Sequence, residues 1–91
     1  MKERIIITVV GKDRVGILAK VCTYLAANSI NILDITQTIV QGIFNMMMIA
    51  ETSEETGAFS QAQKELSQIG EELGVQILCQ KEEIFEKMHR I

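Results

Sequence analysis

The chain has 91 residues, a mass of 10.2 kDa and a formal net charge of −3 at pH 7, which predicts one domain over residues 1–91 with a core small enough to benefit from a partner subunit. Its Lys and Arg residues are scattered, so no basic stripe offers itself to nucleic acid. No apolar run reaches the roughly 18 residues of a membrane span, and no signal peptide is recognisable. We therefore expect a cytoplasmic protein that binds neither nucleic acid nor membrane.

The first two predicted elements are a buried strand and an amphipathic helix. Residues 5–10 are a β-branched run that ends at Gly11, which predicts a strand at the centre of a sheet with both faces covered. Between Gly16 and about Asn28 the apolar residues recur at helical spacing, which predicts a helix with one buried stripe. The members of that stripe are Ile17, Leu18, Val21, Cys22 and Leu25.

A hairpin is predicted after this helix. Leu33, Ile35 and Ile39 alternate with polar residues, which predicts an edge strand with one buried face and one solvated face. Residues 41–42 are Gln-Gly and provide a tight turn, because glycine tolerates the positive φ that such turns require. Residues 43–52 then continue as a third strand.

The second half of the chain predicts another helix and a fourth strand. Residues 59–73 carry apolar side chains at helical spacing, with Thr56 as a candidate N-cap and Gly74 as the end of the helix. An alternating apolar pattern over residues 75–79 predicts the fourth strand. Residues 82–91 have one apolar stripe and predict a short C-terminal helix.

These elements follow the order βαββαβ, which is that of the ferredoxin-like α+β sandwich: a four-stranded antiparallel sheet with two helices on one face, here with a short C-terminal helix added. The opposite face is then solvated, covered by a partner or covered by the tail helix. The third strand argues for a cover, because neighbouring residues point to opposite faces and both faces receive apolar side chains. One face receives Phe44, Met46 and Met48, and the other receives Ile43, Met47 and Ile49.

The loop at residues 11–16 joins the carboxyl end of the first strand to the first helix. Backbone N–H groups at a helix start have no partner within the helix, and the helix dipole adds partial positive charge, so the position attracts a carboxylate. Asp13 would attract an ammonium group. From these residues alone, a small acidic metabolite is the first candidate ligand.

The first third of the chain contains the run Gly11-Lys12-Asp13-Arg14-Val15-Gly16-Ile17-Leu18, with Asn31-Ile32 fifteen residues after Gly16. This pattern, together with the element order over the whole chain, resembles that of ACT domains, the small amino-acid-sensing modules of metabolic enzymes. It is most similar to small stand-alone ACT proteins and to the ACT halves of the glycine cleavage system transcriptional repressor. The tail, residues 84–91, also resembles that stand-alone group.

The resemblance implies a homodimer, often joined side by side through edge strands, with an amino-acid effector between the loop and the neighbouring subunit. The candidate effector-binding residues are Gly11, Asp13, Gly16, Ile17, Leu18, Asn31 and Ile32. Serine-sensing relatives carry histidine at the place of Gly11 and asparagine at that of Asp13, and many members have proline at that of Val15. The resemblance thus implies an amino acid or similar metabolite without naming it. Because Asp13 would attract an ammonium group and repel a carboxylate, such an amino acid would lie with its carboxylate toward the N–H groups of Gly16, Ile17 and Leu18.

Three of these residues also have a structural interpretation. Asp13 could cap the first helix, because an aspartate there satisfies unpaired N–H groups. Gly16 could permit close approach of the helix and a neighbouring backbone. Asn31 could form a hydrogen bond within a local turn.

No catalytic or metal-binding set emerges, so we expect no catalytic residue, no metal and no cofactor. Cys22 and Cys79 are predicted to be small buried hydrophobes rather than disulfide partners, and His89 has no metal-ligand spacing to either. An enzymatic alternative is an acylphosphatase, which shares this topology and holds phosphate with an arginine of the first loop, where this chain has Arg14. In that case Asn45 would have to position the attacking water.

The sequence favours a regulatory module: a homodimer that binds an amino acid or similar small-molecule effector at its interface and changes what a partner protein recognises. The alternative from another class is an interaction module that dimerises and binds another protein without any ligand, through the exposed sheet face and the tail helix.

Overall fold

The computed structural model describes residues 2–12, 16–53 and 57–83, except for the side chains of Lys2 and Ser53. Four strands and two helices follow one another in the predicted order βαββαβ. Their bounds are β1 (Lys2–Lys12), α1 (Ile17–Ala27), β2 (Asn31–Val40), β3 (Ile43–Ser53), α2 (Ala58–Leu73) and β4 (Gln76–Lys81). Neither helix is long and apolar enough to cross a membrane in this part of the chain.

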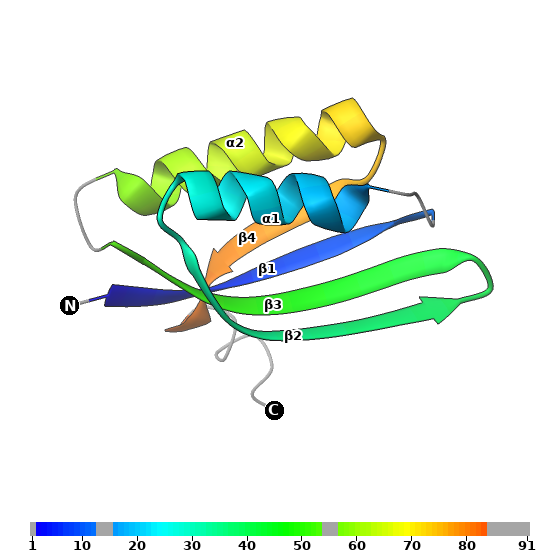
Figure 1. The fold of residues 1–91 in the computed structure, drawn as a ribbon, viewed down its shortest axis with the longest axis horizontal. Helices are drawn as coiled ribbons and strands as arrows, with labels where there is room; N and C mark the ends of the chain where they lie inside the picture. The colour runs from blue at the N-terminus through cyan, green and yellow to red at the C-terminus, as the bar shows by residue number, and fades with distance from the viewer. Residues whose placement is uncertain (1, 13–15, 54–56, 84–91) are drawn as a thin grey trace.

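The strands form one antiparallel sheet in the order β2-β3-β1-β4, and both helices lie on the same face of it (Figure 1). This confirms the ferredoxin-like α+β sandwich and the central position of β1. It follows from the sequence of the elements, because each strand-helix-strand unit is a crossover that leaves room for a strand of the other unit.

The core lies between the helices and the two central strands. The apolar helix-facing side chains of β1 and β3 are all at most 8% exposed, and they alternate along each strand as the period of two requires. They are Ile5, Ile7 and Val9 on β1 and Phe44, Met46, Met48 and Ala50 on β3. The consecutive methionines therefore divide between the two faces, since Met47 on the open face is 39% exposed. The prediction for this strand is confirmed.

Helix α2 covers the β4 edge. Leu66 and Ile69 are buried on its inner side, opposite Ile77 and Cys79 of β4. Gln63 donates a hydrogen bond from Nε2 to the Cys79 carbonyl at 2.9 Å, which ties the helix to the strand. The end of α2 at Gly74 is confirmed, but its N-cap is Gly57, a residue with φ of 88°, instead of Thr56. Thr56 lies outside the described residues.

The hairpin turn confirms its prediction, because Gln41 and Gly42 both have positive φ, 50° and 82°. The predicted buried face of β2 is wrong. Ile35 and Ile39 point to the helix side of the sheet, yet they are 38% and 58% exposed. Only Ile32, at the start of the strand, packs against the core, and the helix-facing side chains of β2 beyond it are exposed.

The register of β2 shifts between Ile32 and Asp34, which leaves Leu33 as the extra residue of a bulge, 43% exposed. The predicted C-terminal helix over 82–91 lies outside the described residues, apart from Glu82 and Glu83. Glu82 forms an ion pair with Arg4, with Arg4 Nε and Glu82 Oε2 3.2 Å apart.

Candidate functional site

The loop end of the sheet is where β1 ends and α1 begins. Gly11 is the last but one residue of β1, opposite Phe44 of β3. A Cβ at this position would lie 2.7 Å from the Val75 Cβ, so the glycine lets the connection between α2 and β4 pack directly against β1. Gly11 therefore has a structural role: it allows β1 to pack closely against Val75.

Gly16 differs from this. Among the described residues a Cβ there would meet nothing within 4 Å, so these residues give no close approach that requires glycine at this position. Its φ of 95° gives the reason for glycine instead, because this residue is the left-handed N-cap of α1. The Gly16 carbonyl accepts the first helical hydrogen bond, from the Lys20 N–H at 2.9 Å.

The first turn of α1 has an anion-binding character. The N–H groups of Ile17, Leu18 and Ala19 have no intrahelical partner, as at the start of any helix. Among the described residues no side chain caps this turn, and no acidic residue lies within it. Ile17 is buried at 2% exposure and anchors the turn, while Leu18 is 36% exposed. Asp13, the other predicted loop residue, lies outside the described residues, as do Arg14 and Val15.

Asn31 and Ile32 lie at the other end of the sheet. Asn31 is opposite Glu51 of β3, whereas Gly11 is opposite Phe44 of the same strand. These two positions are seven residues apart along β3, which corresponds to about 23 Å of strand. Within one chain the structure therefore separates the predicted site into a loop half and an Asn31 half.

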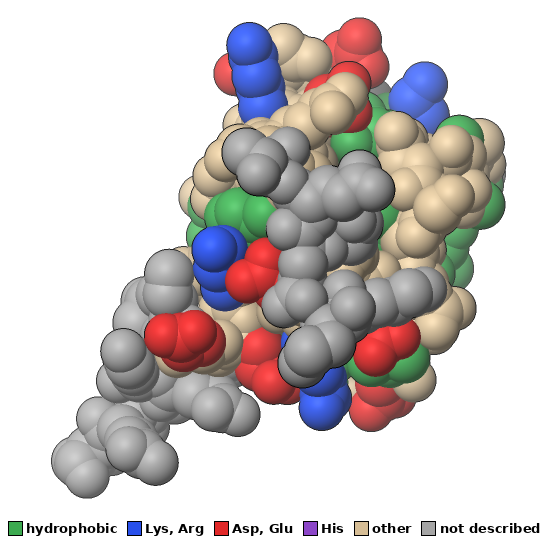
Figure 2. Space-filling view, turned by 90° about the vertical axis from the view of Figure 1, so that its left-hand side faces the viewer, with side chains coloured by type: hydrophobic (Ala, Val, Ile, Leu, Met, Phe, Trp, Pro, Cys, Tyr) green, Lys and Arg blue, Asp and Glu red, His purple; other side chains and the backbone are tan. Residues whose placement is uncertain are grey.

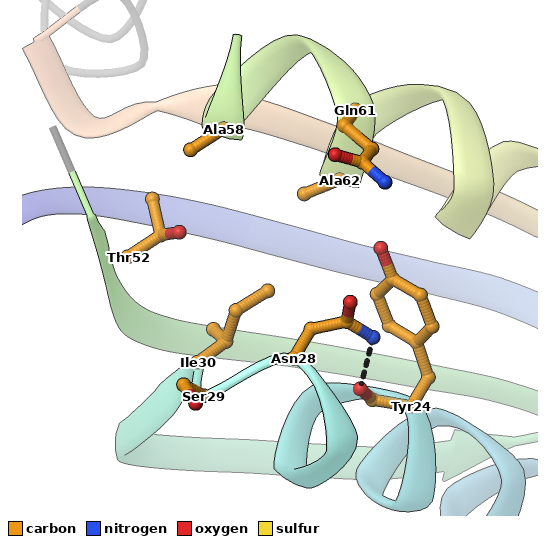
Figure 3. A pocket seen from close by; sticks show the side chains of 8 residues that line it. All are labelled: Tyr24, Asn28, Ser29, Ile30, Thr52, Ala58, Gln61 and Ala62. Carbon is orange, nitrogen blue, oxygen red and sulfur yellow. Dashed lines mark hydrogen bonds between the residues drawn. The ribbon is translucent and has the colours of Figure 1, made fainter. Parts of the chain in front are cut away.

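A cavity of about 270 Å³ lies at the Asn31 end, between the C-terminus of α1 and the N-terminus of α2 (Figure 3). Among the described residues its polar lining consists of Tyr24, Asn28, Ser29, Thr52 and Gln61. Ile30, Ala58 and Ala62 supply apolar wall. Sequence reasoning missed this cavity, although one signal was present: Thr52 is a polar residue at the end of the otherwise apolar helix-facing row of β3.

Tyr24 closes one side of the cavity. Its hydroxyl donates a 2.6 Å hydrogen bond to Glu65 Oε1 on α2, which joins the two helices. Burial, the Glu65 bond and the Glu65 charge all raise the pKa of Tyr24 above its ordinary value of 10. The phenol therefore stays neutral at physiological pH.

The turn that leads from α1 to β2 forms another wall. Asn28 donates from Nδ2 to the Tyr24 carbonyl at 2.9 Å, and the Ile30 N–H bonds to the Leu25 carbonyl at 2.9 Å. Ser29 has a positive φ of 57° between them, in the position that glycine favours at a helix end. Helix α1 thus stops in a fixed turn immediately before Asn31.

Within the residues that the structure describes, no group of three or more metal-ligating side chains occurs. Cys22 and Cys79 are both free thiols. Burial raises the pKa of the Cys79 thiol to about 12, so it behaves as the small hydrophobe that its apolar strand predicted.

The βαββαβ fold and the loop at residues 11–16 together point to a known protein family. Residues 3–80 match the model of the ACT domain family, and the chain belongs to that family. Among curated relatives it is 53% identical over 89 residues to a UPF0237 protein of Bifidobacterium longum and 48% identical to one of Methanocaldococcus jannaschii. Each comparison covers 98% of this chain and 99% of the relative. ACT domains are small regulatory modules, typically non-catalytic, that generally bind small effectors.

Comparison with solved structures shows the same fold. An ACT domain protein from Streptococcus pneumoniae has a TM-score of 0.81 at 40% identity, over 94% of this chain and 97% of that chain. A putative glycine cleavage system transcriptional repressor has a TM-score of 0.79 at 21% identity, over 89% of this chain and 46% of that chain. The second likeness establishes the shared fold, and it confirms the similarity to the ACT halves of such repressors.

Proposed function

We propose that the chain is a regulatory module that binds an amino acid or a similar metabolite at the interface of a homodimer. The observation that carries the proposal is the distance between the two halves of the site. The loop half can offer N–H groups to a carboxylate, but Asn31 is about 23 Å of strand away in the same chain. A second copy can bring the halves together.

The bare edge strand β2 is the surface through which the copies would pair. It is ten residues long, and its exposed apolar side chains include Leu33, Ile35, Ile39 and Val40, at 38% to 58% exposure. A long apolar edge exposes unpaired backbone groups and favours strand addition. β4 is less suited to this because it has six residues and α2 covers its inner side.

Symmetry supports the same arrangement. In a two-fold dimer each copy uses the same surface, so β2 would pair antiparallel with the partner's β2. The start of one β2 then lies beside the end of the other. The end of β2 is at the loop end of the sheet, because Ile39 is opposite Phe44 and Phe44 is opposite Gly11. Asn31 of one copy would therefore approach the loop of its partner.

The chemistry of the joined site suits an amino acid. The N–H groups of the first turn of α1 would receive the carboxylate, and Asp13 would receive the ammonium group. Asn31 from the partner would add an amide that can both donate and accept. Binding at the interface would stabilise the dimer, and a partner protein could then read that state.

The test is thermal unfolding of the purified chain against each of the twenty amino acids, with molecular mass in solution measured in parallel. Selective binding at one hundred times the dissociation constant stabilises the fold by about 2.7 kcal/mol. Asn31→Ala and Asp13→Ala should abolish the shift. Asn45→Ala is the matched control, because Asn45 bonds to the Ile43 carbonyl of its own strand, with Nδ2 and O 3.5 Å apart.

The dimer has its own test. Ile39→Lys on β2 should dissociate it, because a lysine on an edge strand opposes pairing, while Leu78→Lys on β4 should leave it intact. Leu78 is 48% exposed and makes a matched control. A chain that is monomeric at all accessible concentrations would contradict the proposal.

The exposed apolar edge also favours a second function, a dimeric interaction module that recognises another protein without a ligand. A stable dimer in which no amino acid shifts the unfolding temperature would support this second function and reject the first.

A further inference from the structure

We propose that residues 84–91, which follow the described chain, cover the open face of the sheet, which is the face opposite the two helices. Half of this segment is apolar, because it contains Ile84, Phe85, Met88 and Ile91. The open face lies apart from the proposed amino-acid site, and the contact would form with or without an effector.

The open face carries a contiguous group of apolar side chains, and α1 and α2 both lie on the other face (Figure 1). Ile6 and Ile49 are opposite each other on the two central strands. Met47 of β3 and Leu78 of β4 are both opposite Thr8 of β1. Exposure rises outward across this open-face cluster of Ile6, Ile49, Met47 and Leu78, from 4% at Ile6 to 39% at Met47 and 48% at Leu78. A contiguous apolar group of this kind marks a surface that another segment or molecule covers.

The chain leaves β4 on the same face as this cluster. Alternation along β1 puts Arg4 on the open face, since the buried Ile5 faces the helices. Glu82 directly follows the last residue of β4, and its Oε2 lies 3.2 Å from Arg4 Nε. Arg4 is two residues from Ile6 on the same side of β1. The segment therefore begins beside the open-face cluster.

The other surfaces near the end of β4 offer less to an apolar segment. Figure 2 views the molecule from this end and shows acidic and basic side chains interspersed there. Lys81 Nζ lies 3.4 Å from Glu3 Oε2 and 5.4 Å from the centre of the Phe59 ring of α2. Helix α2 thus already covers the helix side of β4. Apolar side chains that follow Glu83 gain most burial on the open face.

The length of the segment matches the cluster. Arg4 and Thr8 are four residues apart on β1, which corresponds to about 13 Å of strand. From β4 across β1 to β3 is two strand spacings, or about 10 Å. Eight residues span about 12 Å as a helix that is about 10 Å wide, and about 26 Å as an extended chain. The segment can therefore cover the cluster in either conformation.

A second copy fits this face less well. A stable interface buries about 800 Å² on each partner, whereas the polar residues Thr36, Thr38 and Asn45 directly border the cluster on β2 and β3. A hollow of about 240 Å³, lined by Thr8, Thr36 and Met47 among others, gives room for a side chain of the segment. The segment is also tethered, so its effective concentration at the face is of millimolar order at any protein concentration. Cover by the segment would leave β2 as the exposed apolar surface.

The experiment is NMR of the full chain without added ligand, with the methyl groups of Met, Leu and Ile labelled. We expect nuclear Overhauser contacts between the Phe85 ring and the methyl groups of Met47 and Leu78. Phe85→Ser removes the ring and should shift both methyl signals, while the signal of Met48 on the helix side stays in place. Glu86→Ser is the matched control and should shift neither, because residue 86 lies away from the apolar side in a helix and in an extended chain alike.

A reciprocal variant tests the contact from the sheet, so the test survives if Phe85→Ser fails to fold. Met47→Thr should shift the ring signals of Phe85. Val40→Thr should not, because Val40 is an exposed residue near the hairpin turn, far from the end of β4. Absence of contacts between Phe85 and the open-face cluster, or equal effects of Phe85→Ser and Glu86→Ser, would overturn the inference. Signals of Met47 and Leu78 that move with protein concentration and ignore Phe85→Ser would overturn it as well, and would assign the face to a second copy.

Discussion

The two edge strands of the sheet, β4 and β2, differ in how far the helices cover them. β4 is short, and α2 covers its inner side: Ile77 and Cys79 are 5% and 3% exposed, and Lys81 Nζ lies 5.4 Å from the centre of the Phe59 ring. β2 is longer, and all its side chains except the half-buried Ile32 are exposed. The β4 edge is therefore covered by a helix of the same chain, whereas the β2 edge presents exposed apolar side chains that a second copy can cover.

The same contrast appears in the turns that end the two helices. Both helices end with the same two backbone hydrogen bonds. The N–H of the residue with left-handed φ donates to the carbonyl three residues earlier, and the N–H of the next residue donates to the carbonyl five residues earlier. On the β4 side the left-handed residue is Gly74, with φ of 73°. On the β2 side it is Ser29, which adopts this conformation at a steric cost.

The largest expected effect compares two leucines. Leu66→Ala, on the inner side of α2, should reduce the free energy of unfolding by about 2–5 kcal/mol, because Leu66 is fully buried and truncation leaves a cavity. Leu33→Ala on β2 should change it by less than about 0.5 kcal/mol in the monomer, since Leu33 is 43% exposed. Urea unfolding at a concentration where the chain is monomeric measures both. Equal losses would show that β2 is as well covered as β4.

The second prediction concerns pH. Burial raises the pKa of Cys79 from 9.0 to about 12, so the folded chain keeps a proton that the unfolded chain releases above pH 9. The resulting stabilisation is complete below pH 9 and is lost as pH rises toward 12, by up to about 1.4 kcal/mol per pH unit. Urea unfolding between pH 8 and pH 10 should show this fall, and Cys79→Ala should remove it. A slope that survives in Cys79→Ala would assign the effect to another group.

The third prediction concerns the two loop glycines. Gly11→Ala forces a Cβ against Val75, which directly precedes β4, and should reduce the free energy of unfolding by about 1–3 kcal/mol. Gly16→Ala meets open space and should cost about 1 kcal/mol, through its positive φ alone. Val75→Ala should rescue part of the Gly11→Ala loss and none of the Gly16→Ala loss. Thermal or urea unfolding of the single and double variants decides this.

The smallest expected effect lies at the helix ends. Ser29→Gly should raise the free energy of unfolding by up to about 1 kcal/mol, because glycine adopts positive φ without a Cβ clash. Gly74→Ser should lower it by a similar amount. If Ser29→Gly is neutral, the turn before Asn31 is not strained, and the two helix ends are equivalent.

Much of the fold could be predicted from the sequence because local rules determine it. The β-branched run of β1, the helical spacing in α1 and α2, the Gln41-Gly42 turn and the stop at Gly74 each depend on neighbouring residues. The order of the elements then limits the topology to a crossover arrangement. The alternation of Met46, Met47 and Met48 between two faces follows from the period of a strand.

The candidate site was predicted less well. The sequence placed Gly11 and Gly16 together in a loop, but it assigned the close approach to Gly16, whereas Gly11 has the neighbour, Val75, 64 residues away in the chain. Spacing alone could not show that Asn31 starts at the far end of the sheet from the loop. Nor could it show that Thr52 lines a cavity with residues of both helices.

The sequence by itself determined which residues form strands, helices and turns, and which family pattern they match, because hydrophobic periodicity and backbone preferences act over short distances. Only the tertiary structure decided which apolar faces are covered. The face of β2 that alternates like a buried strand is exposed beyond Ile32, since the core side chains of the two helices pack against β1, β3 and β4. Burial therefore depends on elements that lie far away in the chain.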